Sequence, residues 1–557
     1  MVSLSFHDTN FQRALVVGRR WSDAVQAIRA QSIEKMHNCR TPLRIVLIAA
    51  QCACRGTDAS DTSRLPGDQL AQRYCQSCHV LPAPTLLDKP SWQRFVLPRM
   101  ARRLGIRGVG APEDEERIER GSGGAIVNAA GVFPDSSVIT RAQWDRIAAY
   151  YLAAAPASQP APAIPTVKGT LSGFRVQVPD FHVATPMITL LHIDSVQRRI
   201  FAGDATFGGP SLNILDGTGH LLSTLPMRSP LASLQTSGDT MRAVFMGQLA
   251  PSDAPRGTAA LIAAWRVGHN PVMTWEVDEL QRPVFATWAD INGDGLEDAV
   301  VSEFGNYTGA LAWYERLPGG RNRRHVLLPQ PGAMTTIVRD FDGDGKRDIL
   351  ALMAQGDEGI VLFHGRGNGT FEMERLLRFP PSYGSTSMQL VDMNGDGLDD
   401  IVYTNGDAGD YPGPAKPYHG IHIFLNDGRG HYAEKFFFPM PGAYKAIARD
   451  FDGDGKIDIA AISFFPDYAS RTPLSFVYLQ GTGDLHFAAS TFPEADRGRW
   501  LTMDAGDIDG DGKVDLVLGS FAQMDTRGDR SAGARWHHPG EPTILILKNT
   551  SATTARK

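Results

Sequence analysis

The sequence has few cysteines, no long apolar run and no excess of basic residues. Only five of its 557 residues are cysteines, which is too few for a fold built on disulfides. No stretch approaches the roughly 20 consecutive apolar residues that span a bilayer, which excludes a polytopic membrane protein. Lysines and arginines number 55 against 61 aspartates and glutamates. The chain therefore offers no basic field for a nucleic acid and no polybasic membrane patch.

The length and the composition indicate several ordinary globular units. A chain of 557 residues exceeds a typical domain of about 100 to 200 residues, so more than one folding unit is expected. Hydrophobic residues make up 42% and charged residues 21%, which excludes wholesale disorder. Glycine is in excess, with 57 residues or about 10% against a usual ~7%. Many tight turns, and hence many short strands, are expected.

Residues 36–54 have the pattern of a bacterial export signal. Arg40 and Arg44 precede a short apolar run at residues 45–50, and small residues and a cysteine follow it. We therefore expect export to the periplasm or the outer surface. The alternative is that residues 45–50 form a buried strand.

The signal predicts how the N-terminal part of the chain is divided. We expect Met36 to be the true start, with residues 1–35 either mis-assigned or disordered and residues 55–64 a linker. Cys52 or Cys54 could carry a lipid anchor, although neither follows a good lipobox, because Gln51 lies at −1 of one and −3 of the other. Lipid attachment and plain cleavage both remain open.

Two of the cysteines belong to the sequence Cys75-Gln-Ser-Cys78-His79. This is the spacing of c-type haem attachment, in which each thiol adds to one vinyl group and the adjacent histidine is the proximal ligand. A zinc site would need further ligands, and no second cysteine pair follows. A thioredoxin-like site would need a βαβ pattern around the motif, and the sequence has none there. We predict one covalent haem c.

A methionine after the motif is the expected sixth ligand, because His/Met ligation is typical of electron-carrier cytochromes. Met100 is the only methionine between His79 and residue 187. Pro98 lies two residues before it, and we expect this proline to hold the chain out of a helix and present the sulfur to the iron. The alternative is that Met100 fills the hydrophobic core.

Residues 140–152 are predicted to form a helix. Thr140 suits an N-cap, and Trp144, Ile147 and Tyr151 fall on one face at i, i+3 and i+7. With the preceding CxxCH motif, residues 65–155 resemble a class I cytochrome c. The resemblance implies a small all-α domain whose C-terminal helix packs over the haem. Residues 156–165, rich in proline and alanine, follow as a semi-rigid linker.

Five copies of an aspartate-rich loop come after the linker. The first, residues 290–298, reads Asp-Ile-Asn-Gly-Asp-Gly-Leu-Glu-Asp, and the others begin at residues 340, 392, 450 and 507. Side-chain oxygens at positions 1, 3, 5 and 9, with a backbone carbonyl at position 7, are the ligands that Ca²⁺ requires. The expected ligands are Asp290, Asn292, Asp294, Leu296, Asp298, Asp340, Asp342, Asp344, Lys346, Asp348, Asp392, Asn394, Asp396, Leu398, Asp400, Asp450, Asp452, Asp454, Lys456, Asp458, Asp507, Asp509, Asp511, Lys513 and Asp515.

These loops differ from EF-hands. An EF-hand carries a bidentate glutamate at position 12, where the five copies have Val301, Ala351, Tyr403, Ala461 and Leu518. Each loop runs instead into a short apolar segment that predicts a buried strand. We expect about five calcium ions with a structural role.

The repeat spacing predicts a propeller. The loops start 50, 52, 58 and 57 residues apart, which suits one four-stranded blade each. A second glycine-rich turn between two strands recurs in residues 362–371, 424–432 and 478–487. Residues 166–289 have room for two further blades without a calcium loop. Seven units would close a ring, so an all-β, seven-bladed propeller is predicted over residues 166–550, with a tail at 551–557.

Residues 284–548 resemble the FG-GAP/VCBS repeats that integrin α subunits also contain. This resemblance implies that the aspartates and asparagines of the five loops are calcium ligands. The whole chain resembles bacterial proteins that join a c-type cytochrome to such a propeller, which implies an architecture and no particular substrate.

The residues six positions after each last aspartate should lie at one rim of the ring, because the repeats are in register. Loops on one face of a rigid scaffold are common binding sites, so this rim is expected to bind a ligand or to dock the haem domain. The alternative is that its aromatic rings pack between blades. The candidate rim residues are Phe304, Tyr307, Asp410, Tyr418, His419, Phe464, Asp467 and Tyr468.

Three functions remain open. The first is an exported haem c electron-transfer protein whose propeller docks a redox-partner protein or a small-molecule substrate. The second is a periplasmic, dehydrogenase-like oxidoreductase with a substrate site on the rim, although the tryptophan-containing repeats and vicinal cysteines of quinone-cofactor propellers are missing. The third is a calcium-dependent adhesion or binding module. Nucleic acid is not an expected partner, and membrane attachment would involve only an N-terminal lipid.

Overall fold

The computed structural model describes residues 62–110, 118–206, 208–269, 271–409, 414–467, 474–522 and 541–551. The predicted export signal with Cys52 and Cys54 lies outside the described residues, as do Asp410 and Tyr468 of the predicted rim. No helix within the described ranges is both long enough and apolar enough to cross a membrane. Residues from Thr62 onward form one compact unit of helices followed by sheets.

Among the described residues, the helices lie in residues 62–155, apart from one 3-10 turn, η6 (Pro493–Arg497), in the sheet region. They are η2 (Thr62–Arg64), α2 (Gly67–Cys75), η3 (Pro84–Leu86), α3 (Lys89–Ser91), the π-helical turn η4 (Trp92–Val96), α4 (Leu97–Arg103), α5 (Ser122–Ala129) and α6 (Arg141–Ala154).

The helix predicted at residues 140–152 is confirmed as α6. Thr140 and Gln143 form a reciprocal capping box, in which the Gln143 N–H donates to Thr140 Oγ1 at 3.2 Å and the Thr140 N–H donates to Gln143 Oε1 at 2.8 Å. Trp144, Ile147 and Tyr151 are buried in one hydrophobic cluster, as their spacing predicts. The Tyr151 ring lies 4.3 Å from that of Trp92, so α6 is fixed against η4 across the core of the helical part.

The expectation that Pro98 keeps Met100 out of a helix is wrong. Both residues belong to α4, and Pro98 occupies its first turn. The segments α3, η4 and α4 follow one another without a break, and the residues at their junctions have αR backbone angles. Pro98, which has no N–H to donate, is accommodated directly after the π-helical turn η4, where the Leu97 N–H already bonds the Trp92 carbonyl five residues back. Met100 lies instead on a helical turn, where it packs against the cluster that contains Trp92 and Tyr151.

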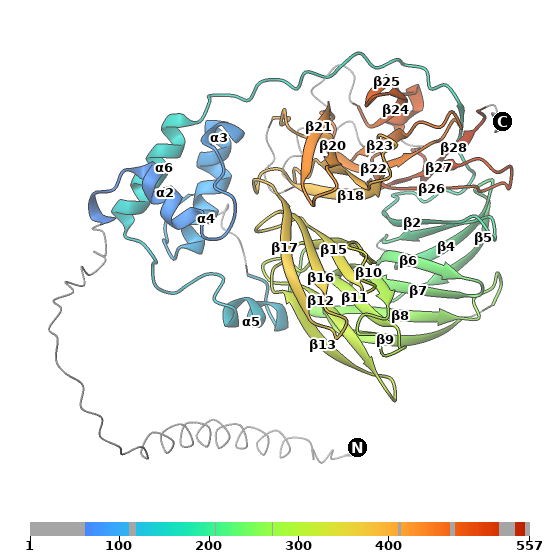
Figure 1. Ribbon diagram of the computed structural model, residues 1–557, viewed down its shortest axis with the longest axis horizontal. Helices are drawn as coiled ribbons and strands as arrows, with labels where there is room; N and C mark the ends of the chain where they lie inside the picture. Colours follow the sequence, from blue (N-terminus) through green and yellow to red (C-terminus); the bar gives the residue numbers. More distant parts are fainter. Residues whose placement is uncertain are drawn as a thin grey trace, which may run out of the picture. The chain divides into compact units, whose positions relative to one another are not determined.

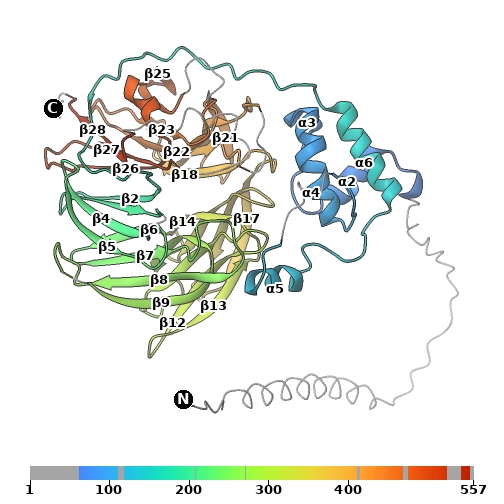
Figure 2. The same ribbon diagram turned by 180° about the vertical axis from the view of Figure 1, so that it is seen from behind.

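Seven four-stranded antiparallel sheets follow, so the predicted seven-bladed propeller is confirmed (Figure 1). Six blades use four consecutive strands each, from β2–β5 to β22–β25. The seventh blade combines β26, β27 and β28 with β1 (Phe174–Gln177) from the other end of the sheet region. Phe174 pairs with Asn549 across this junction. Strand β1 therefore closes the ring, and β26 lies beside β2 in both views (Figures 1 and 2).

The first strands of neighbouring blades contact one another and line the inside of the ring. They are β2 (Ile188–Asp194), β6 (Leu231–Ser237), β10 (Pro283–Ala289), β14 (Ala333–Arg339), β18 (Ser385–Val391), β22 (Ala443–Arg449) and β26 (Trp500–Gly506). The second strands are β3 (Arg199–Asp204), β7 (Thr240–Phe245), β11 (Asp298–Glu303), β15 (Asp348–Met353), β19 (Asp400–Asn405), β23 (Asp458–Ser463) and β27 (Asp515–Ser520).

The second strands that follow the aspartate loops are buried along their whole length, as the apolar segments predict. The third strands are β4 (Ser211–Asp216), β8 (Pro255–Ala263), β12 (Ala310–Leu317), β16 (Gly359–Gly365), β20 (Gly420–Asn426), β24 (Phe476–Gly483) and β28 (Ile544–Asn549). The fourth strands besides β1 are β5 (Leu221–Pro226), β9 (Val272–Gln281), β13 (Arg321–Leu328), β17 (Phe371–Arg378), β21 (Tyr432–Pro439) and β25 (His486–Ser490).

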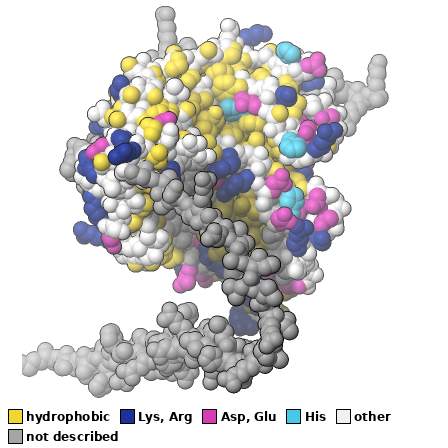
Figure 3. Space-filling view, turned by 60° about the vertical axis from the view of Figure 1, so that its left-hand side comes forward, with side chains coloured by type: hydrophobic (Ala, Val, Ile, Leu, Met, Phe, Trp, Pro, Cys, Tyr) yellow, Lys and Arg dark blue, Asp and Glu magenta, His cyan; other side chains and the backbone are white. Residues whose placement is uncertain are grey.

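The cores of the blades are built between adjacent sheets. One cluster joins Trp313 of β12 with Ile349 and Phe363 of the next blade, and another joins Ile360 of β16 with Ile401 and Tyr403. Because each sheet shares its core with its neighbours, the ring is stabilised as a whole. Basic and acidic side chains are interspersed on the face that Figure 3 shows, in keeping with the near-balanced charge of the sequence.

Candidate functional site

Each aspartate loop joins the first strand of a blade to the second and wraps around its own first carboxylate. In the loop at residues 290–298, Asp290 Oδ1 accepts the Gly293 N–H at 2.8 Å and Oδ2 accepts the Gly295 N–H at 2.9 Å. Both glycines have φ near +80°, a conformation that other residues rarely adopt. The same two contacts recur in the other four loops. The glycines at positions 4 and 6 are therefore needed for the shape of the loop.

The last aspartate of each loop is buried and bridges the loop to a strand. Asp458 Oδ2 accepts the Phe451 N–H at 3.0 Å and the Tyr478 hydroxyl at 2.7 Å, while its Oδ1 accepts the Gly481 N–H of β24 at 2.8 Å. Asp298, Asp348, Asp400 and Asp515 make the equivalent pair of backbone contacts. This aspartate thus has a structural role that the spacing of ligands alone did not predict.

Carboxylate oxygens converge in three of the loops. Single oxygens from Asp340, Asp342 and Asp344 lie within 4.8 Å of one another, and the same holds for two further trios. Two oxygens bound at 2.3–2.6 Å on opposite sides of one Ca²⁺ would be about 5 Å apart, so this spacing fits a shared cation. The trios of the two other loops are Asp450, Asp452 and Asp458, and Asp507, Asp509 and Asp511. In the loop at residues 340–348, Asp342 and Asp348 also converge with His364 of β16. In the remaining two loops, an asparagine replaces the aspartate at position 3.

Lysines partly neutralise these loops. Lys346 Nζ donates to Asp344 Oδ2 at 2.7 Å, and this contact lowers the pKa of the Asp344 carboxyl. Lys456 makes the equivalent contact with Asp454 at 2.9 Å. Burial has the opposite effect on the last aspartate of four loops: it raises the pKa of Asp298, Asp400 and Asp458, and it raises that of Asp515 to about 6. Asp344 is therefore more readily ionised than these buried carboxylates, which accept hydrogen bonds from backbone N–H groups.

The CxxCH residues lie at the end of α2. Cys75 ends the helix, and Cys78 is exposed after it. Burial, and then the neighbouring Cys78, raise the pKa of the Cys75 thiol to about 11, so it is protonated at neutral pH. The His79 Nδ1 lies 2.9 Å from the Val80 carbonyl oxygen. With Nδ1–H donating to that oxygen, Nε2 keeps its lone pair for a metal.

The donor set of this region fits a haem c. Cys75 and Met100 both pack against the hydrophobic cluster of Trp92 and Tyr151, so one core contacts an attachment thiol and the candidate thioether ligand. The two cysteines are free thiols, which thioether formation requires. Zinc is a poorer match, because no group of three metal-binding side chains in the described part of the chain includes these cysteines.

The predicted rim residues belong to the turns between second and third strands. Since these turns and the aspartate loops lie at opposite ends of the second strand, the rim and the candidate calcium sites face opposite ends of the ring. Phe464 is buried in a small cluster with Phe521 and Met187, and His419 is also buried. Part of the predicted rim is thus packing between blades, the alternative that the sequence left open. Phe304, Tyr307, Tyr418 and Asp467 are only partly buried.

Two of the predicted rim tyrosines contact the helical part. Tyr418 Oη donates to the Leu86 carbonyl oxygen at 3.1 Å. The Tyr307 ring lies edge-on to Phe133 with 5.2 Å between centroids, and the Arg103 guanidinium lies 5.6 Å from the Tyr307 centroid. The turns of two different blades therefore hold the helical part at the same end of the ring.

A third contact uses residues that the sequence did not single out. Glu119 accepts the Asp253 N–H at 2.6 Å and the Ser252 hydroxyl at 2.8 Å. Asp253, which is fully buried, in turn accepts the N–H groups of residues 306–308 through Oδ1. It therefore joins the turn between β7 and β8 to the turn that carries Tyr307. The Pro-Ser-Asp-Ala-Pro sequence around it signals a turn but not this contact.

The fold and loops define a β-propeller with aspartate-rich loops in five of its seven blades. Residues 290–351, 340–403 and 450–518 match the family described as FG-GAP-like repeat. Each match starts at one aspartate loop, includes the next loop and ends in the second strand of that next blade. The three matches together therefore include all five loops. The propeller therefore contains FG-GAP-like repeats within residues 290–403 and 450–518. A search of curated proteins finds no match.

Solved structures similar to this chain include the N-terminal domain of Nup159, at 11% identity and a TM-score of 0.40 over 69% of this chain and 97% of that one. An Agrocybe aegerita lectin specific for non-reducing terminal N-acetylglucosamine aligns at 14% identity and 0.34, over 68% and 100%. An S. cerevisiae Dbp5 complex with Nup159 aligns at 10% and 0.37, over 69% and 97%.

Proposed function

We propose that this protein is an exported haem c electron carrier whose helical part is docked on a calcium-stabilised propeller. The proposal rests above all on the donor set at the end of α2. Two free thiols, a histidine oriented through Nδ1 and a methionine on the same core are together in one small helical unit. Cys75 and Cys78 would hold the haem by thioether bonds, with His79 and Met100 as axial ligands. The bound haem would supply a one-electron Fe(III)/Fe(II) couple.

The contacts with the propeller support a fixed placement of the electron carrier. Tyr418, Tyr307 and Asp253 reach the helical part from turns of three different blades. A scaffold that holds the helical part at three points would present a constant haem edge to a redox partner. The aspartate loops, at the opposite end, would each bind one Ca²⁺ and fix the turn to its blade.

The test is to produce the protein with cytochrome c maturation and to record pyridine-haemochrome and redox spectra. Wild-type protein is expected to show one haem per chain, and His79→Ala to alter the axial ligation. Met100→Ala should lower the reduction potential and leave covalent attachment intact. A matched control is Met241→Ala, a buried propeller methionine, which should leave the haem spectrum unchanged. Absence of covalent haem in the wild type would refute the proposal.

A dehydrogenase-like activity would give a different result with the same sample. If oxidised protein is mixed with sugars, alcohols or aldehydes, an electron carrier should stay oxidised until a redox partner is added. Reduction of the haem by one of these substrates would instead favour an oxidoreductase with a substrate site on the rim.

A further inference from the structure

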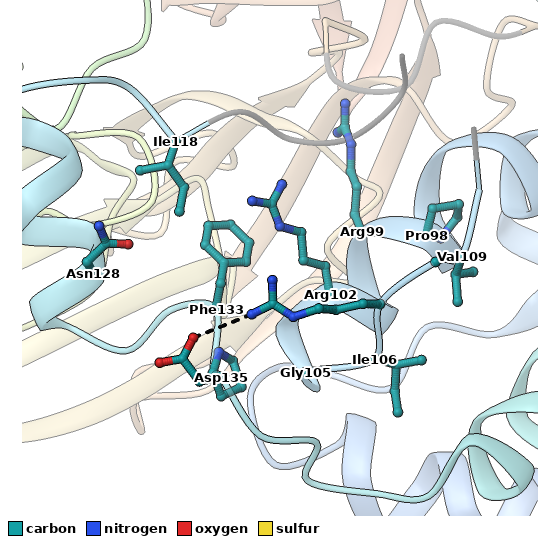
Figure 4. Close-up of a pocket in the computed structure, with 13 residues that line it drawn as sticks. Pro98, Arg99, Arg102, Gly105, Ile106, Val109, Ile118, Asn128, Phe133 and Asp135 are labelled. Carbon is teal, nitrogen blue, oxygen red and sulfur yellow. Dashed lines mark hydrogen bonds and ion pairs between the residues drawn. The ribbon is translucent and has the colours of Figure 1, made fainter. Parts of the chain in front are cut away.

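The helical part contains a cavity of about 280 Å³ that the CxxCH motif does not line (Figure 4). It lies between α4, the segment of residues 105–109 and residues 118–135. None of its lining residues belongs to α2 or to the attachment motif. The cavity thus does not involve the attachment motif, although it shares helix α4 with Met100.

Three arginine side chains line this cavity, Arg99, Arg102 and Arg107, and Asp135 is the one carboxylate among its described lining residues. The Arg107 Nη2 to Asp135 Oδ1 distance is 3.4 Å, and both side chains are largely exposed. A long, exposed ion pair of this kind contributes little stability. Even without Arg99, which has interactions of its own, Arg102 and Arg107 outnumber the single carboxylate of the described lining.

Arg102 is the most informative of the three. Its guanidinium lies 4.5 Å from the centroid of the Phe133 ring, which fixes its plane by a cation–π contact. Its Nη1 is buried and has no hydrogen-bond partner among the described residues. A buried donor left without an acceptor costs roughly 1–3 kcal/mol, and more when it is charged. An oxygen acceptor in the cavity would remove that cost.

We propose that this cavity binds a small anion through carboxylate or phosphate oxygens. Arginine guanidinium groups bind both kinds of oxygen with paired, charge-assisted hydrogen bonds. Arg102, oriented by Phe133, is the principal contact, and Arg107 supplies a second guanidinium from the rim of the cavity. Asn128, which also lines it, can donate through its side-chain amide. The volume suits a ligand of a few heavy atoms.

The test is isothermal titration calorimetry, in which the full-length protein is titrated with inorganic phosphate and, separately, with succinate. Sodium chloride keeps the ionic strength constant. One saturable site is expected for at least one of the two anions, and the preferred anion identifies the type of oxygen. Arg102→Gln should weaken binding about tenfold or more, because it removes a charge-assisted contact. Arg107→Gln should also weaken it. Asp135→Asn should strengthen it, because the competing carboxylate is removed.

Arg141→Gln is the matched control, since Arg141 is an exposed arginine of α6 paired with Asp145. It changes the net charge equally and should not alter the affinity. If Arg102→Gln fails to fold, the opposite effects expected for Arg107→Gln and Asp135→Asn still decide the matter, because both side chains are exposed. The proposal is overturned by the absence of saturable binding of either anion up to about 10 mM, or by equal weakening in the Arg141→Gln control.

Discussion

The last aspartate of each loop should stabilise the propeller even without calcium, whereas an outer aspartate should matter only through calcium. Asp458 and Asp454 of one loop allow this to be tested. Asp458 is fully buried and accepts hydrogen bonds from Phe451, Tyr478 and Gly481. Asp454 is at the surface and accepts from Lys456. Replacement by alanine removes a carboxylate in both cases, but only Asp458→Ala leaves buried donors without an acceptor.

The size of the effect follows from the number of those donors. Each buried donor left unsatisfied costs about 1–3 kcal/mol, and the three share one side chain, so Asp458→Ala should lower the free energy of unfolding by roughly 3–6 kcal/mol. Asp454→Ala removes exposed contacts, each worth less than about 1 kcal/mol. Tyr478→Phe, which removes one of the three donors together with its bond, should fall between these values.

The assay is urea unfolding followed by tryptophan fluorescence, with excess EGTA and with millimolar Ca²⁺. In EGTA, Asp458→Ala should be strongly destabilised and Asp454→Ala should resemble the wild type. In Ca²⁺, the wild type should gain stability and Asp454→Ala should gain less, because one ligand of one site is lost. Equal stability of Asp458→Ala and the wild type in EGTA would refute the hydrogen-bond argument. A wild type that is indifferent to Ca²⁺ would refute the calcium proposal.

Three other predictions concern groups away from the aspartate loops. Burial raises the pKa of Glu358 from 4.5 to about 8, so the protonated carboxyl contributes stability that is complete below about pH 4.5 and is lost as the pH rises through about 8. Above pH 8, the free energy of unfolding of Glu358→Gln should therefore exceed that of the wild type by roughly 3–5 kcal/mol more than it does at low pH. Parallel pH profiles of the two unfolding free energies would contradict this. Asp253→Ala should speed amide hydrogen exchange of residues 306–308, whose N–H groups it accepts, and unchanged exchange would show that the turn holds without it. Tyr418→Phe should weaken the contact with Leu86 by about 1 kcal/mol, seen as faster exchange in residues 84–87 with no change in the propeller core, and protection equal to the wild type would count against this contact.

The fold could be predicted because its determinants are local and repeated. The aspartate loop specifies its own turn through Asp290, Gly293 and Gly295, and the apolar segment after it specifies the second strand. Repeated in five copies, these signals predict five blades, and the length of residues 166–289 adds the two that complete the ring. The closure by β1 was not predicted, because Phe174 pairs with Asn549 across 375 positions (549 − 174) and no local pattern records such a pairing.

Predictions about single side chains were less secure. Met100 was expected outside a helix because Pro98 precedes it, but the π-helical turn η4 accommodates this proline and the helix continues into α4. Rim aromatic residues were recognised by register, yet register could not distinguish Tyr418, which contacts the helical part, from Phe464, which packs between blades. Glu119 was missed because its contact with Asp253 depends on tertiary placement.

The proposed function depends on a covalent haem c in the helical part. Intact-mass spectrometry of the purified protein, followed by tandem spectrometry of the peptide that contains Cys75 and Cys78, tests it most directly. We expect the mass to increase by that of one haem, and we expect the added mass to lie on that peptide and to be lost when both cysteines are replaced by alanine. A wild-type chain with the unmodified mass, produced with active cytochrome c maturation, would contradict it.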